Sequence, residues 1–122
     1  MKNTLLICDD DEDILELCRT ILEKDFRVVT TNNTENIQEL IKAYNPNLVL
    51  MDLWIPQIGG DNATLILKQN KTTSNIPIVL FSANEEIESI CKKVNADGFI
   101  KKPFSVKNMK EYIHEKINTS LN

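Results

Sequence analysis

The sequence has 122 residues, of which 42% are hydrophobic and 26% charged, a balance typical of one compact domain with its own core. Its net charge of −4 argues against direct binding of nucleic acid. No stretch approaches the roughly 20 apolar residues of a membrane span, so neither a nucleic acid nor a membrane is expected as a partner.

The amino-terminal residues and the cysteines predict a cytoplasmic location. The opening stretch MKNTLLICDDD turns acidic too early for a secretory signal peptide. Cys8, Cys18 and Cys91 lie in apolar patterns and lack the spacing of a CxxC or Cys/His site. We therefore expect three buried free thiols in a reducing cytosol.

Two hydrophobic periods alternate along the chain, one typical of buried strands and one of amphipathic helices. In chain order they predict a strand at 2–8, a helix at 11–24, a strand at 26–30, a helix at 34–44, a strand at 47–51, a helix at 61–70, a strand at 76–81, a helix at 85–94, a strand at 97–100 and a helix at 105–118. Such alternation predicts a doubly wound α/β fold, with parallel strands, right-handed crossovers and helices on both faces. Without a repeat or a linker, one domain over residues 1–122 is expected.

Polar side chains follow four of the five predicted strands. Asp9 and Asp10 come after the first, Asp52 after the third, Ser82 after the fourth and Lys102 after the fifth. Ligands of open parallel sheets bind beyond the carboxyl ends of the strands. We therefore expect these five side chains to meet at one edge of the sheet.

This edge would carry more negative than positive charge. Two carboxylates about 4 Å apart repel each other by roughly 4 kcal/mol at an effective dielectric constant near 20. Lys102 supplies one positive charge, and carboxylate oxygens are suitable ligands for Mg²⁺. Beside such an ion, one carboxylate can attack phosphorus while the metal and Lys102 stabilise the phosphoryl oxygens. Asp52, alone at the end of a buried strand, is placed like a phosphoryl acceptor.

Four segments, taken together and in order, resemble receiver domains of bacterial two-component response regulators over essentially the whole chain. They are LLICDDDEDI, LVLMDLWIPQIGG, IPIVLFSAN and FIKKPF. The resemblance, which is to single-domain chemotaxis regulators in particular, implies a flavodoxin-like (βα)5 fold with strand order 2-1-3-4-5. It also implies a phosphoacceptor switch that is phosphorylated by a phosphohistidine of a sensor histidine kinase or a histidine phosphotransfer protein, and that acts on a further protein target.

The same resemblance implies the metal site. Asp9 and Asp10 would hold Mg²⁺, Asp52 would be phosphorylated and also bind the metal, and the main-chain carbonyl of Trp54 would be a further ligand. Gly59 stands where the family often has an acid. Trp54 is large for its position, and we leave open whether it shields the acyl phosphate, packs over its loop or contacts a partner.

Further roles concern the phosphoryl group and the switch. Ser82 and Lys102 match the hydroxyl and the lysine that bind the phosphoryl group, and Pro103 follows where a cis peptide is usual. Phe99 matches a switch aromatic, although the core role is the one that we favour for it. Ser82 also has an alternative role as the N-cap of the next helix. His114 is expected on the surface, with no part as a phosphodonor.

Three alternatives to a complete switch remain at this point. The chain can be a scaffold that works without phosphorylation, although none of the acids or the lysine is missing. It can also be the receiver part of a longer regulator with an output domain. A phosphohydrolase is disfavoured because Trp54 occupies the position of its second acid. We expect self-assisted phosphorylation and slow hydrolysis without enzymatic turnover, in a monomer or a phosphorylation-dependent dimer.

Overall fold

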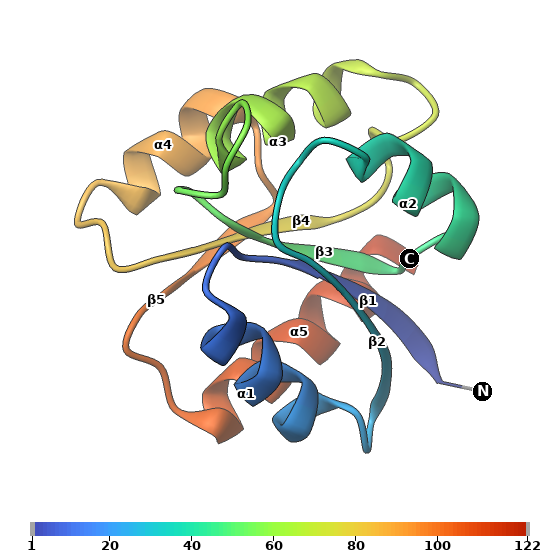
Figure 1. Ribbon diagram of the computed structural model, residues 1–122, viewed down its shortest axis with the longest axis vertical. Helices are drawn as coiled ribbons and strands as arrows, with labels where there is room; N and C mark the ends of the chain where they lie inside the picture. Colours follow the sequence, from blue (N-terminus) through green and yellow to red (C-terminus); the bar gives the residue numbers. More distant parts are fainter. Residues whose placement is uncertain (1, 122) are drawn as a thin grey trace.

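The computed structural model describes residues 2–121, within which strands and helices alternate throughout. In chain order the elements are β1 (Asn3–Cys8), α1 (Glu12–Leu22), β2 (Phe26–Thr31), α2 (Ile37–Tyr44), β3 (Leu48–Asp52), α3 (Gly60–Gln69), β4 (Ile78–Ser82), α4 (Ile87–Val94), β5 (Gly98–Lys101) and α5 (Val106–Leu121). All neighbouring strands are parallel, in the order β2-β1-β3-β4-β5 (Figure 1). The predicted α/β fold and strand order are confirmed.

The sheet forms the middle of three layers, with α1 and α5 on one face and α2, α3 and α4 on the other (Figure 1). Every residue of β3 and β4 is buried, and so are five of the six residues of β1, because these inner strands are covered from both sides. Each face has its own apolar core, one centred on α1 and α5 and one on the other three helices. In the described part of the chain, no helix is long and apolar enough to cross a membrane.

The ends of the helices follow from local side-chain chemistry. The Asp11 carboxylate caps α1 by accepting the N–H groups of Asp13 and Ile14. Helices α2 and α4 end at Asn45 and Asn95, with φ angles of 48° and 63°. Asparagine adopts this left-handed conformation more readily than most residues, so it stops a helix without a glycine.

Three predicted starts are wrong by two or three residues, each because of an identifiable backbone or side-chain feature, and the helices predicted to end at residues 24 and 118 end at Leu22 and Leu121. The helix predicted from residue 34 begins at Ile37, because the Thr34 hydroxyl donates instead to the carbonyl of Pro56, at 2.9 Å. The helix predicted from residue 85 begins at Ile87, after the Asn84 side chain has accepted the N–H of Glu86. The strand predicted from residue 76 begins at Ile78, because Pro77 has no N–H to pair.

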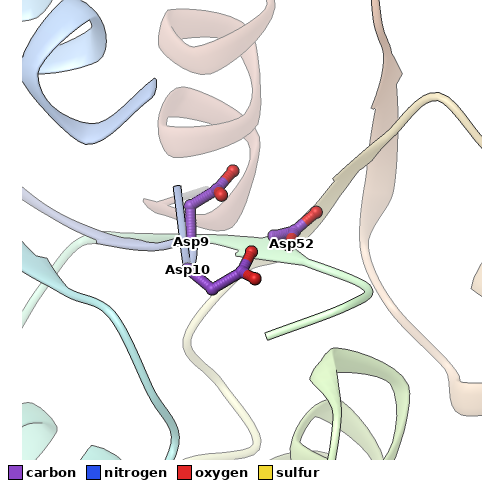
Figure 2. A group of neighbouring side chains, drawn as sticks. All are labelled: Asp9, Asp10 and Asp52. Atoms are coloured by element: carbon purple, nitrogen blue, oxygen red, sulfur yellow. The ribbon is translucent and has the colours of Figure 1, made fainter. Parts of the chain in front are cut away.

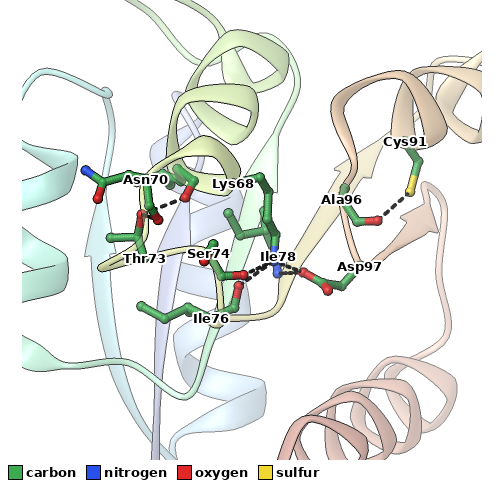
Figure 3. Close-up of polar contacts among 10 residues, drawn as sticks. Lys68, Asn70, Thr73, Ser74, Ile76, Ile78, Cys91, Ala96 and Asp97 are labelled. Carbon is green, nitrogen blue, oxygen red and sulfur yellow. Dashed lines mark hydrogen bonds and ion pairs between the residues drawn. The ribbon is translucent and has the colours of Figure 1, made fainter.

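A buried lysine closes the amino-terminal edge of the sheet (Figure 3). The side chain of Lys68, in α3, is 6% exposed, and its ammonium donates to the carbonyls of Ser74 and Ile76 at 3.1 and 2.8 Å. The same ammonium forms an ion pair with Asp97, whose carboxylate also accepts the N–H of Ile78 at 2.7 Å. One side chain thereby joins α3, the α3–β4 loop and the turn before β5.

Replacing Lys68 with methionine should destabilise the fold, because two carbonyls and a carboxylate would lose their partner. Removing one member of a buried ion pair costs about 3–5 kcal/mol. The Asp97 side chain is 39% exposed, so water replaces part of the loss and we expect about 1–3 kcal/mol. Urea unfolding of Lys68→Met against Lys71→Met, an exposed lysine in the following loop, measures the difference. Equal stabilities of the two variants would contradict this role.

Candidate functional site

Asp9 and Asp10 lie just beyond the carboxyl end of β1. The N–H of Asp9 donates to the carbonyl of Thr31 at 3.1 Å, which extends the pairing with β2 by one residue and draws Asp9 into the sheet edge. Asp9 is 1% exposed, and one of its carboxylate oxygens accepts the N–H of Asp11 at 3.0 Å. Asp10 is exposed. The pair therefore offers one buried carboxylate and one open to solvent.

Asp52 is the last residue of β3, the strand between β1 and β4 in the sheet. It is 4% exposed. Its carboxylate lies beside those of Asp9 and Asp10 (Figure 2), and one oxygen from each of the three can be chosen so that all lie within 4.8 Å of one another. The predicted meeting of three acids at this edge is thus observed.

Lys102 reaches the same place from the loop after β5. Its ammonium lies 3.1 Å from a carboxylate oxygen of Asp9 and 3.6 Å from one of Asp52. The backbone holds it there, because the N–H of Lys102 donates to the carbonyl of Ser82 at 2.9 Å. The Lys102–Pro103 peptide is cis, as the family resemblance implies. The ammonium also lies 4.4 Å from the centre of the Phe81 ring, a favourable cation–π contact.

The electrostatics of the cluster leave it short of positive charge. Burial, and then the charge of Asp9, raise the pKa of Asp52 to about 6, although the Lys102 ammonium works in the opposite direction. The charge of Asp10 and its hydrogen bond to Asp52 raise the pKa further. A group of oxygen ligands with this residual negative charge is chemically suited to a hard divalent cation such as Mg²⁺.

The loop after β3 brings the start of α3 against Asp52. A Cβ atom at Gly60 would collide with the carbonyl oxygen of Asp52, so only glycine allows this approach. Gly59 has a φ of 87°, the left-handed conformation that glycine adopts without strain. Gly59 therefore allows the chain to turn, and Gly60 allows the start of α3 to pack closely against Asp52. Trp54, in the same loop, is 70% exposed and lines a shallow hollow with Asn84 and Ile90.

Ser82 is the last residue of β4 and is 1% exposed. Its hydroxyl oxygen accepts the N–H of Asn84 at 3.1 Å, and α4 begins only at Ile87 after Glu86. The alternative that Ser82 caps this helix is therefore wrong. The Ser82 carbonyl accepts the N–H of Lys102, so the main chains of these two residues are neighbours at this edge of the sheet.

Phe99 lies on β5, away from the acids. It is half-buried and packs against the core on the α2, α3 and α4 side, while its N–H donates to the hydroxyl of Tyr112 at 3.0 Å. The packing fits the core alternative and leaves the switch role a prediction. Tyr112 was not singled out from the sequence, since a tyrosine at helical spacing gives no sign that its hydroxyl serves a strand.

The three cysteines are free and buried, as expected. Burial raises the pKa of each thiol, that of Cys18 to about 11, and the nearest acid raises it further. Thiols with raised pKa values are poor nucleophiles and metal ligands at neutral pH, so they serve as packing groups. His114 is exposed, with its ring 4.7 Å from that of Phe26.

A family model described as the response regulator receiver domain matches residues 5–114. The chain is 32% identical over 117 residues to the chemotaxis protein CheY of Halobacterium salinarum, which covers 94% of this chain and 97% of that protein. It is 31% identical over 109 residues to the phosphate regulon transcriptional regulatory protein PhoB of Pseudomonas aeruginosa, covering 87% of this chain but only 48% of that protein. The chain thus spans nearly all of one relative and about half of the other.

Solved structures show the same fold. The receiver domain of the sensor histidine kinase PA1611 from Pseudomonas aeruginosa, solved with a magnesium ion in its active-site cleft, superposes with a TM-score of 0.87. The match covers 97% of this chain and 99% of that one, at 17% identity, so it supports the architecture alone. On the family match over residues 5–114 and the archaeal relative, this chain belongs to the response regulator receiver domain family.

Proposed function

We propose that this protein is a phosphoacceptor switch of two-component signalling, in which Asp52 receives a phosphoryl group from the phosphohistidine of a sensor histidine kinase or a histidine phosphotransfer protein. One observation carries the proposal: the oxygens of Asp9, Asp10 and Asp52 gather within 4.8 Å, with the Lys102 ammonium 3.1 and 3.6 Å from two of the carboxylates. The family to which the chain belongs supports the same reading.

The acid cluster fits Mg²⁺ in both charge and size. Ligand oxygens about 2.1 Å from a Mg²⁺ ion lie about 3–4 Å from one another, close to the spacing of the three carboxylates. We assign Asp9, Asp10, Asp52 and the Trp54 carbonyl as its protein ligands. When bound, the ion would offset the negative charge of the cluster and polarise the phosphoryl oxygens.

The chain's own residues supply the rest of the reaction. With a pKa of about 6, Asp52 is mostly ionised at pH 7 and can act as the nucleophile. An oxygen–phosphorus bond forms at Asp52 as the nitrogen–phosphorus bond of the donor histidine breaks, and the bonding electrons return to the imidazole. The Lys102 ammonium is close enough to Asp52 to stabilise the negative charge on the oxygens of the transferring phosphoryl group. The Ser82 hydroxyl, which accepts from Asn84, keeps its own proton for a phosphoryl oxygen.

The output would be a conformational change at one face of the domain. The phosphoryl group would draw Ser82 toward itself, and Phe99 would move into the space that this opens. Such a step changes the surface formed by α4, β5 and α5, where a protein target would bind. The domain assists its own phosphorylation and slow hydrolysis without turning over a substrate. We further propose that residues 1–122 form one receiver domain that works in the cytoplasm, as a monomer or a phosphorylation-dependent dimer.

Phosphorylation should occur once per chain and require both Mg²⁺ and Asp52. We expect intact mass spectrometry after incubation with acetyl phosphate to show a single phosphoryl adduct in Mg²⁺, and none in chelator or in Asp52→Asn. Asp61→Asn, which removes an acid at the start of α3, is the control and should keep the adduct. A folded wild-type protein that takes no adduct from either acetyl phosphate or a histidine kinase would favour a scaffold that works without phosphorylation.

Two neighbouring lysines offer a matched test of electrophilic assistance. Lys102 contacts Asp9 and Asp52, whereas Lys101, the last residue of β5, is exposed. We expect Lys102→Met to slow phosphorylation by about 10²–10³-fold, the usual effect of removing one such group from a transition state. Lys101→Met should react at the wild-type rate. The rates follow from the growth of the adduct with time, and equal rates for both variants would remove Lys102 from the mechanism.

Without metal, the charge of Asp52 should cost stability in a pH-dependent way. Its folded pKa of about 6 lies above the ordinary 3.8, so the folded state binds this proton more tightly than the unfolded chain does. The contribution of Asp52 to the free energy of unfolding is therefore most favourable below pH 3.8. It falls as the pH rises from 3.8 to about 6, in total by roughly 3 kcal/mol for a shift of about two pKa units. In chelator, Asp52→Asn should be about 1–3 kcal/mol more stable than wild type at pH 7.5.

The advantage of Asp52→Asn should vanish near pH 4, and Mg²⁺ should stabilise the wild type more than the variant. Urea unfolding across the pH range measures both effects. Glu16→Gln, at an exposed position of α1, controls for the general loss of one negative charge. An Asp52→Asn variant no more stable than Glu16→Gln at pH 7.5 would show that the cluster is not under electrostatic strain.

A further inference from the structure

Thr34 connects two loops that are distant in the sequence. It lies between β2 and α2, is 5% exposed, and faces the loop between β3 and α3. Its hydroxyl donates to the carbonyl of Pro56 at 2.9 Å and accepts the N–H of Ile58 at 3.4 Å. The N–H of Thr34 also donates to the Pro56 carbonyl, at 3.3 Å. Three hydrogen bonds from one residue therefore hold the chain on both sides of Gln57.

The segment that Thr34 holds is strained. Gln57 has a φ of 86°, a conformation that few residues other than glycine adopt and that costs about 1–3 kcal/mol. Such a conformation persists only where the surrounding contacts impose it. Within residues 2–121, the other hydrogen bonds that hold this loop come from α3, such as the one from Asn62 to the Ile58 carbonyl at 2.8 Å. Thr34 is the tie from outside that helix.

The same loop begins immediately after Asp52 and contains Trp54. Resting on the function proposed above, we propose that Thr34 is a positioning residue for the metal site. Its hydroxyl fixes the β3–α3 loop before any ion binds, so that the main chain of this loop, which includes Trp54, is already ordered when it supplies a ligand. Thr34 does not touch the reacting atoms, and it acts through the loop alone.

This arrangement has a thermodynamic signature. A loop that is already ordered loses little conformational entropy when it supplies a metal ligand. A loop without the Thr34 hydrogen bonds must be ordered on binding, and this entropy cost weakens the affinity for the metal. Loss of the tie should therefore weaken the affinity for Mg²⁺. It should leave the rate of phosphorylation at saturating Mg²⁺ near that of wild type, because Asp52 and Lys102 are held by the sheet and by the loop after β5.

Three variants test this inference. Thr34→Val keeps the shape and removes the hydroxyl, while Thr34→Ser restores it. Thr73→Val is the matched control, because Thr73 is also a buried loop threonine, 6% exposed, whose hydroxyl donates to the Leu67 carbonyl at 2.6 Å, at the opposite edge of the sheet (Figure 3). Mg²⁺ binding is followed by the fluorescence of Trp54, the single tryptophan of the chain, and by the amide shifts of Asp9 and Asp52.

We expect Thr34→Val to raise the dissociation constant for Mg²⁺ about 3- to 10-fold, somewhat less than the 10- to 100-fold typical of residues that contact a metal ligand directly. Thr34→Ser should stay within about 2-fold of wild type. Thr73→Val should lose stability but keep its Mg²⁺ affinity. A Thr34→Val protein that binds Mg²⁺ like wild type would overturn the inference and leave the proposed function intact.

A second measurement uses the metal-free wild-type protein and requires no substitution. In metal-free wild type, the amide of Ile58 should be protected from hydrogen exchange to about the level of Gly60, whose N–H donates to Leu53 at 3.0 Å. Rapid exchange of the Ile58 amide beside a protected Gly60 amide would show that the hydrogen bond from Ile58 to the Thr34 hydroxyl does not persist in solution. A wild-type protein that shows no response to Mg²⁺ and no phosphoryl adduct would overturn the proposed function and this inference together.

Discussion

The site depends on one ammonium shared between two buried carboxylates. Lys102 approaches Asp9 and Asp52 from a loop at the far end of the sequence, and both acids are almost inaccessible to water. Buried charges of like sign are tolerated only with a compensating cation close by. One lysine does not balance the charge of three acids, and burial together with the charge of Asp9 raises the pKa of Asp52. The residual negative charge should cost stability, and it is the same property that suits this edge to the divalent cation that we propose.

The opposite edge of the sheet uses the same pair of residue types with a different result. Lys68 has three acceptors, two carbonyls and the Asp97 carboxylate, and Asp97 in turn accepts a backbone N–H. That network is electrostatically balanced, so it serves the fold. At the carboxyl edge the acids outnumber the cation, so a negative charge remains for the metal ion that we propose. The two edges differ in the number of acids for each lysine, and not in the types of residue that they use.

The loops around the acids are held by backbone constraints as well as by apolar packing, to which Leu53 and Ile55 contribute. Gly60 allows α3 to approach the end of β3, Gly59 turns the chain into the helix, and Thr34 imposes an unusual conformation on Gln57. The candidate site residues lie at the ends of strands and in the loops that follow them, and the precision of the loops depends on such contacts. We assign Thr34 as a positioning residue, so the β3–α3 loop is held by the β2–α2 loop as well as by α3.

The sequence by itself determined the architecture and the place of the site. Continuous apolar runs such as LVLM are typical of inner parallel strands. Residues directly after parallel strands share one edge of the sheet, so Asp9, Asp10, Asp52, Ser82 and Lys102 were predicted to meet. The tertiary structure alone decided the start of α2, the partners of Lys68 and the link from Thr34 to Pro56. The physical reason is that hydrophobic periodicity is a local property of the chain, whereas these hydrogen bonds join segments that become neighbours only after the sheet has formed.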